Sequence, residues 1–121
     1  MRRVVITGLG AVTPLGNSVE ETWAGIKAGK SGIGPITYYD TSVSAIKYAG
    51  EVKNFEAEKY MDAQAARKMA RFTKYAVAAA KMALDDADLT GNAEVLDKAA
   101  IYLGVGIGGF EVTEKIGRAH V

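Results

Sequence analysis

The 121-residue sequence lacks cysteine altogether and has one histidine, His120, next to its last residue. Without cysteine there can be no disulfide, no cysteine-ligated zinc and no cysteine nucleophile within these residues. A lone imidazole cannot form a metal cluster, and no carboxylate partner stands near it in the sequence, so we expect His120 to take no part in catalysis. The sequence therefore predicts no catalytic residue and no metal site in this chain.

A surplus of charge of one sign is absent too. Fifteen Lys and Arg stand against 14 Asp and Glu, which gives a formal net charge of +1. No global field would attract nucleic acid or a membrane surface. There is no apolar run long enough to cross a bilayer and no signal-peptide pattern at the start. We therefore expect one globular unit in the cytoplasm, with no nucleic-acid partner and no membrane insertion.

The hydrophobic pattern predicts strands and helices. Val4, Val5 and Ile6 form a β-branched run that ends in glycine, as a buried strand does. Ser18 followed by Glu21 is a capping-box pattern that starts a helix. The expected elements are a strand at 4–6, a helix at about 19–28, a connection at 29–42, a short strand at 48–52, a helix at about 63–86 and a strand from 99. This order indicates a layered α/β fold.

Small residues mark one stretch of the long helical pattern. Alanines stand at positions 76, 78, 79, 80 and 83, and the same stripe begins with Met69 and Phe72. Small side chains let a neighbouring backbone approach closely, so we expect this helix to be central and its stripe to face a core.

Two glycine-rich segments raise the question of a nucleotide site. The first, GLGAVTPLG, has Thr13 where a dinucleotide fingerprint needs its third glycine, and Pro14 and Gly16 delay the following helix. A phosphate at these glycines would not meet a helix N-terminus, so nucleotide binding is a disfavoured alternative. The second segment, GVGIGG at 104–109, is interpreted as a tight turn.

Basic residues recur along the same helical pattern. Arg67, Arg71, Lys74 and Lys81 are spaced by four, three and seven residues, and Lys68 lies beside them. From the spacing alone a solvated helix face is favoured over a docking site for an acidic protein partner.

Six segments, taken in order, resemble the start of a β-ketoacyl-[acyl-carrier-protein] synthase. They are RRVVITGLGAVTPLGN, AGKSGIGPIT, YDTS, AGEVKNF, ARKMARFTKYAVAAAKMAL and GVGIGG, and they cover residues 1 to about 115. The segments around residues 34–42 and 49–55 are more similar to synthase II than to synthase I. The resemblance implies the N-terminal portion of a thiolase-like layered α-β-α fold, incomplete in this chain, in which the first glycine-rich turn is structural.

The resemblance also implies an acyltransferase chemistry. In the family a cysteine takes an acyl chain from acyl carrier protein, malonyl-carrier protein is decarboxylated, and the resulting carbanion attacks the thioester. This needs an activated thiolate, an oxyanion hole and two histidines. In the family the cysteine and both histidines follow the glycine cluster and are absent from this chain, as is the catalytic lysine. The expected parent is a homodimer of fatty acid biosynthesis that needs no cofactor and binds phosphopantetheine-linked acyl and malonyl groups.

Some family roles transfer to residues of this chain. Ile107 matches the isoleucine that lines the acyl pocket near the dimer interface, which implies a role in chain length. Arg67 and Lys68 match two residues that contact the acidic carrier protein, and Arg71 is expected to join them. Gln64 stands where some relatives have a third basic residue.

The last six residues, IGRAHV, do not resemble the family's continuation. They are also the translation of ATC GGA AGA GCA CAC GTC, part of a common short-read sequencing adapter. We therefore expect residues 116–121 to be adapter read-through, and residues 1–115 to be the N-terminal part of an inactive fragment. Two alternatives stay open: a non-catalytic module that binds acyl carrier protein, and a fragment of a polyketide-type ketosynthase.

Overall fold

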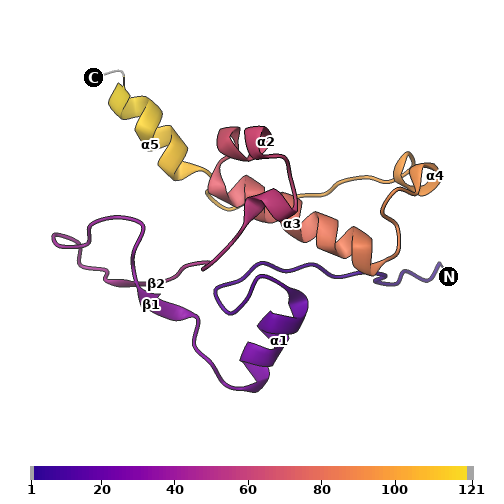
Figure 1. The fold of residues 1–121 in the computed structure, drawn as a ribbon, viewed down its shortest axis with the longest axis horizontal. Helices are drawn as coiled ribbons and strands as arrows, with labels where there is room; N and C mark the ends of the chain where they lie inside the picture. The colour runs from indigo at the N-terminus through magenta and orange to yellow at the C-terminus, as the bar shows by residue number, and fades with distance from the viewer. Residues whose placement is uncertain (1, 120–121) are drawn as a thin grey trace.

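The computed structural model describes residues 2–119 and combines helices with one small sheet (Figure 1). The elements are α1 (Val19–Lys27), β1 (Ile33–Pro35), β2 (Tyr48–Gly50), the 3₁₀ turn η1 (Ala57–Lys59), α2 (Ala63–Lys68), α3 (Arg71–Asp86), α4 (Ala93–Leu96) and α5 (Phe110–Ala119). The mixed helix and strand content agrees with the expected α/β class.

The N-terminal segment runs along α3, and glycine makes that approach close. A Cβ built on Gly8 would lie 2.2 Å from the carbonyl oxygen of Ala83, and one on Gly10 would lie 1.9 Å from that of Ala79. No side chain larger than hydrogen fits at either position. The prediction that the alanines of this helix admit a neighbouring backbone is confirmed, and the contacts account for both glycines without a bound phosphate.

Helix α1 begins and ends where its sequence signals indicate. The Ser18 hydroxyl accepts a hydrogen bond from the Glu21 amide at 3.1 Å, as a helix N-cap does. The Glu21 carboxylate turns back to the amide of Asn17 at 2.7 Å, one residue before the amide that a capping box would reach. After the helix, Gly29 takes a φ of +64°, a left-handed conformation that suits glycine.

The two short strands form an antiparallel hairpin in which Ile33 pairs with Gly50 and Pro35 with Tyr48. The strand expected at 48–52 is therefore confirmed at 48–50. The segment 29–42, expected to be a connection throughout, contains β1, the partner of that strand. Its three residues include proline and glycine, so no periodicity marked it.

The long helix expected over 63–86 is divided into α2 and α3. Met69 (ψ 139°) and Ala70 (ψ 156°) between them have extended backbones. Both residue types favour helix, so local propensity does not cause the break. Its consequence is that the expected basic face is not continuous, because Arg67 and Lys68 lie on α2 whereas Arg71 opens α3.

The strands expected at 4–6 and from 99 are absent from the part of the chain that the structure describes. Val4 is 91% exposed and Ile101 is 93% exposed, so neither segment is buried. A β-branched run becomes a strand only when a neighbour pairs with its backbone, and none does here. The prediction of these two strands was wrong for this structure.

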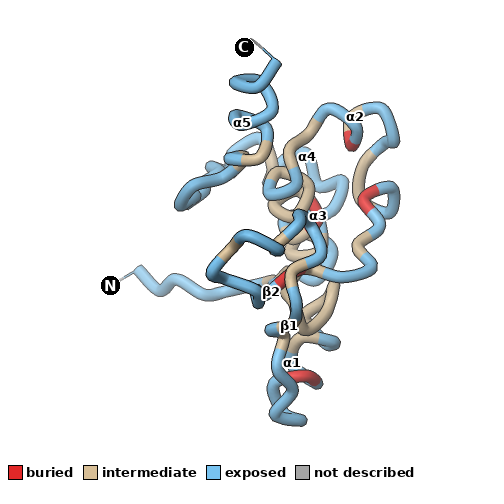
Figure 2. The backbone as a smooth tube through the Cα atoms, turned by 90° about the vertical axis from the view of Figure 1, so that its left-hand side faces the viewer, coloured by how far each residue is buried: buried red, intermediate tan, exposed pale blue. Residues whose placement is uncertain are grey.

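Little of the described chain is buried, as the predominance of pale blue in Figure 2 shows. Within residues 2–119 the buried hydrophobic side chains are all alanines, namely Ala57, Ala66 and Ala78. Large apolar side chains such as Trp23, 56% exposed, remain in contact with water. The α3 stripe thus packs on the N-terminal segment without the large apolar core that we expected.

Candidate functional site: the basic residues around the break between α2 and α3

Helix α2 presents two basic side chains to solvent. Asp62 caps the helix by accepting hydrogen bonds from the amides of Gln64 (3.0 Å) and Ala65 (2.9 Å). Ala66 is only 3% exposed, and the helix lies in contact with η1. Arg67 and Lys68 are exposed in the last turn, where positive charge also complements the helix dipole.

Arg71 has a different environment from its two basic neighbours. Its guanidinium carbon lies 3.6 Å from the centroid of the Tyr38 ring, a close cation–π contact. The Tyr38 hydroxyl donates to the carbonyl oxygen of Val52 at 2.7 Å, which fixes the ring. Arg71 therefore joins the start of α3 to the loop that follows β1.

A buried carboxylate holds this loop by hydrogen bonds. Glu51, 8% exposed, follows β2 and accepts hydrogen bonds from the Thr37 amide (3.0 Å), the Thr37 hydroxyl (2.8 Å) and the Tyr38 amide (3.2 Å). Burial opposes its ionisation, but these hydrogen bonds and the positive charge of Arg71 hold the pKa of Glu51 below its usual range. The anionic carboxylate thus ties the hairpin to the Arg71 contact.

Tyr75, one helical turn after Arg71, completes the cluster. Burial, with a side-chain hydrogen bond to Tyr38, raises the pKa of Tyr75 well above its usual range. The Phe55 ring packs edge-on against it with centroids 5.0 Å apart. The Tyr75 hydroxyl is neutral at physiological pH and serves as a structural hydrogen-bonding group.

The expected acyl-pocket residue, Ile107, is 87% exposed in a loop between α4 and α5. The same loop touches α3 through glycine, since a Cβ built on Gly108 would lie 2.7 Å from the Phe72 ring. Gly109 takes a φ of +73°, which agrees with the predicted tight turn. The loop that carries Ile107 therefore rests on the residue next to Arg71.

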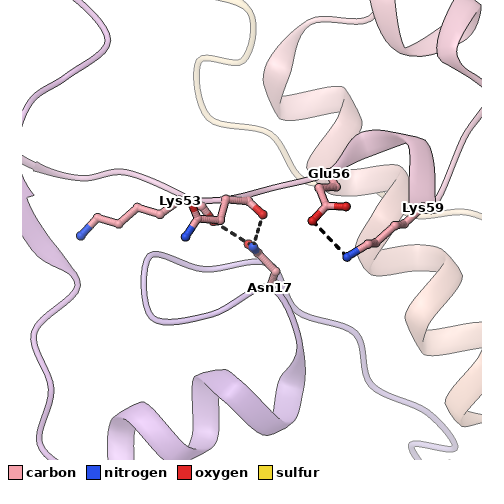
Figure 3. A network of polar contacts seen from close by, with 5 residues as sticks. Asn17, Lys53, Glu56 and Lys59 are labelled. Atoms are coloured by element: carbon pink, nitrogen blue, oxygen red, sulfur yellow. Dashed lines mark hydrogen bonds and ion pairs between the residues drawn. The ribbon is translucent and has the colours of Figure 1, made fainter.

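A polar hollow that sequence reasoning missed lies between the N-terminal loop and the segment before η1. Asn17 donates from its side-chain amide to the carbonyl oxygens of Lys53 (2.8 Å) and Asn54 (3.1 Å), and Figure 3 shows both bonds beside the Glu56–Lys59 ion pair. Among the described residues the Asn17 Oδ1 is buried without a hydrogen-bond partner. Asn17 thus joins the N-terminal loop to residues that follow it by 36 and 37 positions in the sequence.

Tyr38, Tyr75, Glu51 and Asn17 are the site residues that the sequence did not indicate. Tyr38 lies between two of the six segments that carry the resemblance, and Glu51 and Asn17 act through contacts with residues distant in the sequence. No periodicity or spacing reports such contacts. His120 lies outside the described residues. Over residues 2–119 no cluster of acidic, histidine or cysteine residues could hold a metal ion, and no helix is both long and apolar enough to traverse a bilayer.

Comparison with known proteins identifies the family. Residues 1–120 match the family described as "Beta-ketoacyl synthase, N-terminal domain". The chain is 45% identical over 113 residues to 3-oxoacyl-[acyl-carrier-protein] synthase 2 of Synechocystis, covering 93% of this chain and 27% of that protein. It is 46% identical, with the same coverage, to the protein of that name from Staphylococcus aureus.

A solved structure gives the same answer for the fold. The ishigamide ketosynthase/chain length factor superposes with a TM-score of 0.69 and 46% sequence identity, over 75% of this chain and 23% of that one. The likeness confirms the expected thiolase-like fold class. The chain spans about a quarter of the length of the curated relatives that it matches. It belongs to the β-ketoacyl synthase family, whose N-terminal domain it matches.

Proposed function

We propose that residues 1–115 form the N-terminal part of a condensing enzyme that elongates acyl chains on acyl carrier protein in fatty acid biosynthesis. The reaction forms a carbon–carbon bond between the malonyl α-carbon and the acyl thioester carbonyl while CO₂ leaves, and the product is longer by two carbons. The observation that carries the proposal is the 45–46% identity, over 93% of this chain, to proteins named 3-oxoacyl-[acyl-carrier-protein] synthase 2.

The chain itself supplies no catalytic side chain to this reaction. It has no cysteine, and its one histidine lies among residues 116–121, which we propose to be adapter read-through. The nucleophile and the groups that stabilise decarboxylation would then come from residues encoded beyond codon 115. The full-length enzyme would be a cytoplasmic homodimer. Isolated, residues 1–121 are expected to be inactive.

The contribution of this chain is recognition of the carrier. Arg67 and Lys68 are exposed side by side at the end of a capped helix, which suits contact with an acidic protein surface. Arg71, four residues after Arg67 in the sequence, lies on α3 and contacts the Tyr38 ring. Ile107, on the loop beside α3, is proposed to line the acyl pocket, so Ile107→Phe should reduce turnover of long acyl chains more than that of short ones.

A polyketide pathway is the second candidate. The observation that favours it is the 46% identity to the ishigamide ketosynthase/chain length factor, a value equal to that for the synthases. The two pathways differ in what happens after condensation. A full-length enzyme that extends saturated acyl-carrier substrates supports the fatty acid pathway, and one that accepts only unreduced β-keto chains supports the polyketide pathway.

The first experiment is to sequence the source DNA across codon 115 and express the open reading frame that is found. A frame that continues to a cysteine, two histidines and a lysine, with a product that condenses acyl- and malonyl-carrier protein, supports the proposal. A stop after Val121 contradicts it and leaves a carrier-binding module, whose affinity for the carrier should then weaken with salt.

The carrier contact has its own test in the full-length product. Arg67→Gln and Lys68→Gln should each raise the KM for the acyl-carrier substrate about 1.4- to fivefold, since an exposed ion pair contributes about 0.2–1 kcal/mol. The KM for a small acyl-thioester without the protein should not change. Lys27→Gln, an exposed lysine in the last turn of α1, is the matched control. Unchanged KM values in both variants would refute docking at α2.

A further inference from the structure

The three basic residues expected to bind the carrier do not share one environment. Arg67 and Lys68 are exposed in α2, and neither has a side-chain partner among the contacts that the structure gives. Arg71 is exposed as well, but its guanidinium carbon lies over the Tyr38 ring, 3.6 Å from the ring centroid. Of the three basic residues, Arg71 is thus the one with a cation–π contact within the chain.

We propose that Arg71 and Tyr38 form a latch that positions α2, and that Arg71 is a positioning residue and not a carrier contact. The inference rests on the proposed function only in that α2 is taken to bind the carrier. The contact between Arg71 and Tyr38 lies within the chain and does not depend on carrier binding.

The location of the latch supports this role. Helix α2 has six residues, too few to be stable alone, and it is joined to α3 by the extended pair Met69 and Ala70. Arg71 is the first residue after that pair, so holding it fixes the point from which α2 leaves α3. The second attachment of α2 is its contact with η1, where Ala66 is buried.

Tyr38 can hold Arg71 because Tyr38 is itself held from three directions. Its hydroxyl donates to Val52 at 2.7 Å, its amide donates to Glu51 at 3.2 Å, and Tyr75 contacts its side chain. Glu51 also places negative charge near Arg71. Hence the hairpin is the fixed partner, and the orientation of the basic end of α2 depends on a contact made about thirty residues earlier in the sequence.

The chemistry of the latch separates it from a charge contact. A lysine at position 71 keeps the positive charge but loses the planar group that stacks on the ring. A phenylalanine at position 38 keeps the ring and loses only the hydroxyl. If Arg71 contacted the carrier directly, charge would be what matters, and the ring of Tyr38 would not.

The test measures amide hydrogen exchange and carrier kinetics in the full-length product. Arg71→Lys and Tyr38→Leu should each speed exchange in residues 63–70 about two- to fivefold, with the carrier absent, because a partly exposed cation–π contact contributes about 0.5–1 kcal/mol. Tyr38→Phe should remain closer to the wild-type rates. The double variant should exchange no faster than the more affected single variant.

Carrier kinetics give the second readout. A latch predicts that Arg71→Lys raises the KM for the carrier substrate as much as Arg71→Gln does, whereas Arg67→Lys retains most of the wild-type KM. Unchanged exchange in residues 63–70, together with a wild-type KM in Arg71→Lys, would overturn the latch. Faster exchange with no effect of Arg67→Gln or Lys68→Gln on KM would retain the latch and refute docking at α2.

Discussion

The exposed area of the chain leads to a prediction about residues 1–121 on their own. A folded protein of 12.8 kDa exposes about 6,300 Å² of surface. This chain exposes 9745 Å². The excess of roughly 3,500 Å² means that the chain buries about half of its unfolded surface, where a protein of this size ordinarily buries about two thirds.

That excess is large on the scale of protein stability. If only about 1,000 Å² of it is apolar, the missing burial corresponds to about 25 kcal/mol, whereas domains are stable by about 5–15 kcal/mol. The composition of the exposed surface supports the comparison, since it includes Val4 at 91%, Ile101 at 93% and Tyr102 at 93% exposure. We therefore expect the isolated 121-residue chain to unfold without a cooperative transition and to self-associate.

The assay combines thermal unfolding, followed by near- and far-ultraviolet circular dichroism, with binding of a hydrophobic dye and sedimentation. We expect a broad transition, strong dye binding at low temperature and species larger than a monomer. The full-length product under the same conditions is the control, with a sharp transition. A monomeric 121-residue chain with coincident, sharp two-state transitions would refute the reasoning from exposed area.

Three further predictions concern the full-length product. Gly10→Ala should lower the free energy of unfolding in urea by about 1–3 kcal/mol, because its Cβ would meet the Ala79 carbonyl oxygen. Gly106→Ala, with no atom within 4 Å of its added Cβ, should not lower it. Equal effects of the two substitutions would contradict the close-approach explanation. Ser18→Ala should cost about 1 kcal/mol by removing the N-cap of α1, and exchange confined to the amides of the first turn should report it. Glu51 has a lowered pKa, so its stabilisation is complete above its unfolded value of 4.5 and is lost as pH falls through the lower folded value; Glu51→Gln should flatten the urea midpoint against pH in that window, and an unchanged profile would count against an ionised Glu51.

Local signals in the sequence predicted the features that depend only on residues nearby in the sequence, such as helix ends and turns. The N-cap at Ser18 and the stop at Gly29 bound α1 within a residue of the expected limits, because capping and positive φ involve only the adjacent turn. The tight turn at Gly109 was found for the same reason. The strand at 48–50 was also found, although it depends on pairing with β1. The alanine stripe predicted a close neighbour, although not which segment it would be.

The predictions that were wrong concern strands, which depend on contacts between segments distant in the sequence. The run Val4–Ile6 has the composition of a strand, but a strand exists only with a partner, and no described segment pairs with it. The candidate site divides in the same way. Arg67 and Lys68 came from the resemblance and are exposed as a docking role requires, whereas Tyr38 and Glu51 reach Arg71 through the hairpin, a contact that no spacing in the sequence reports.

The break between α2 and α3 shows how contacts between distant segments can override local helix preference. Met69 and Ala70 are good helix formers, so an uninterrupted helix is the local preference, and the extended backbone there gives up intrahelical hydrogen bonds. Contacts elsewhere must offset that loss, and the buried Ala66 and the Arg71–Tyr38 stack lie on either side of it. In a continuous helix Arg67 and Arg71 would lie one turn apart on the same face. Because the helix is broken, Arg67 and Lys68 lie on α2 whereas Arg71, on α3, contacts the hairpin segment at Tyr38. Under the proposed latch, the hairpin therefore sets the geometry of the basic surface.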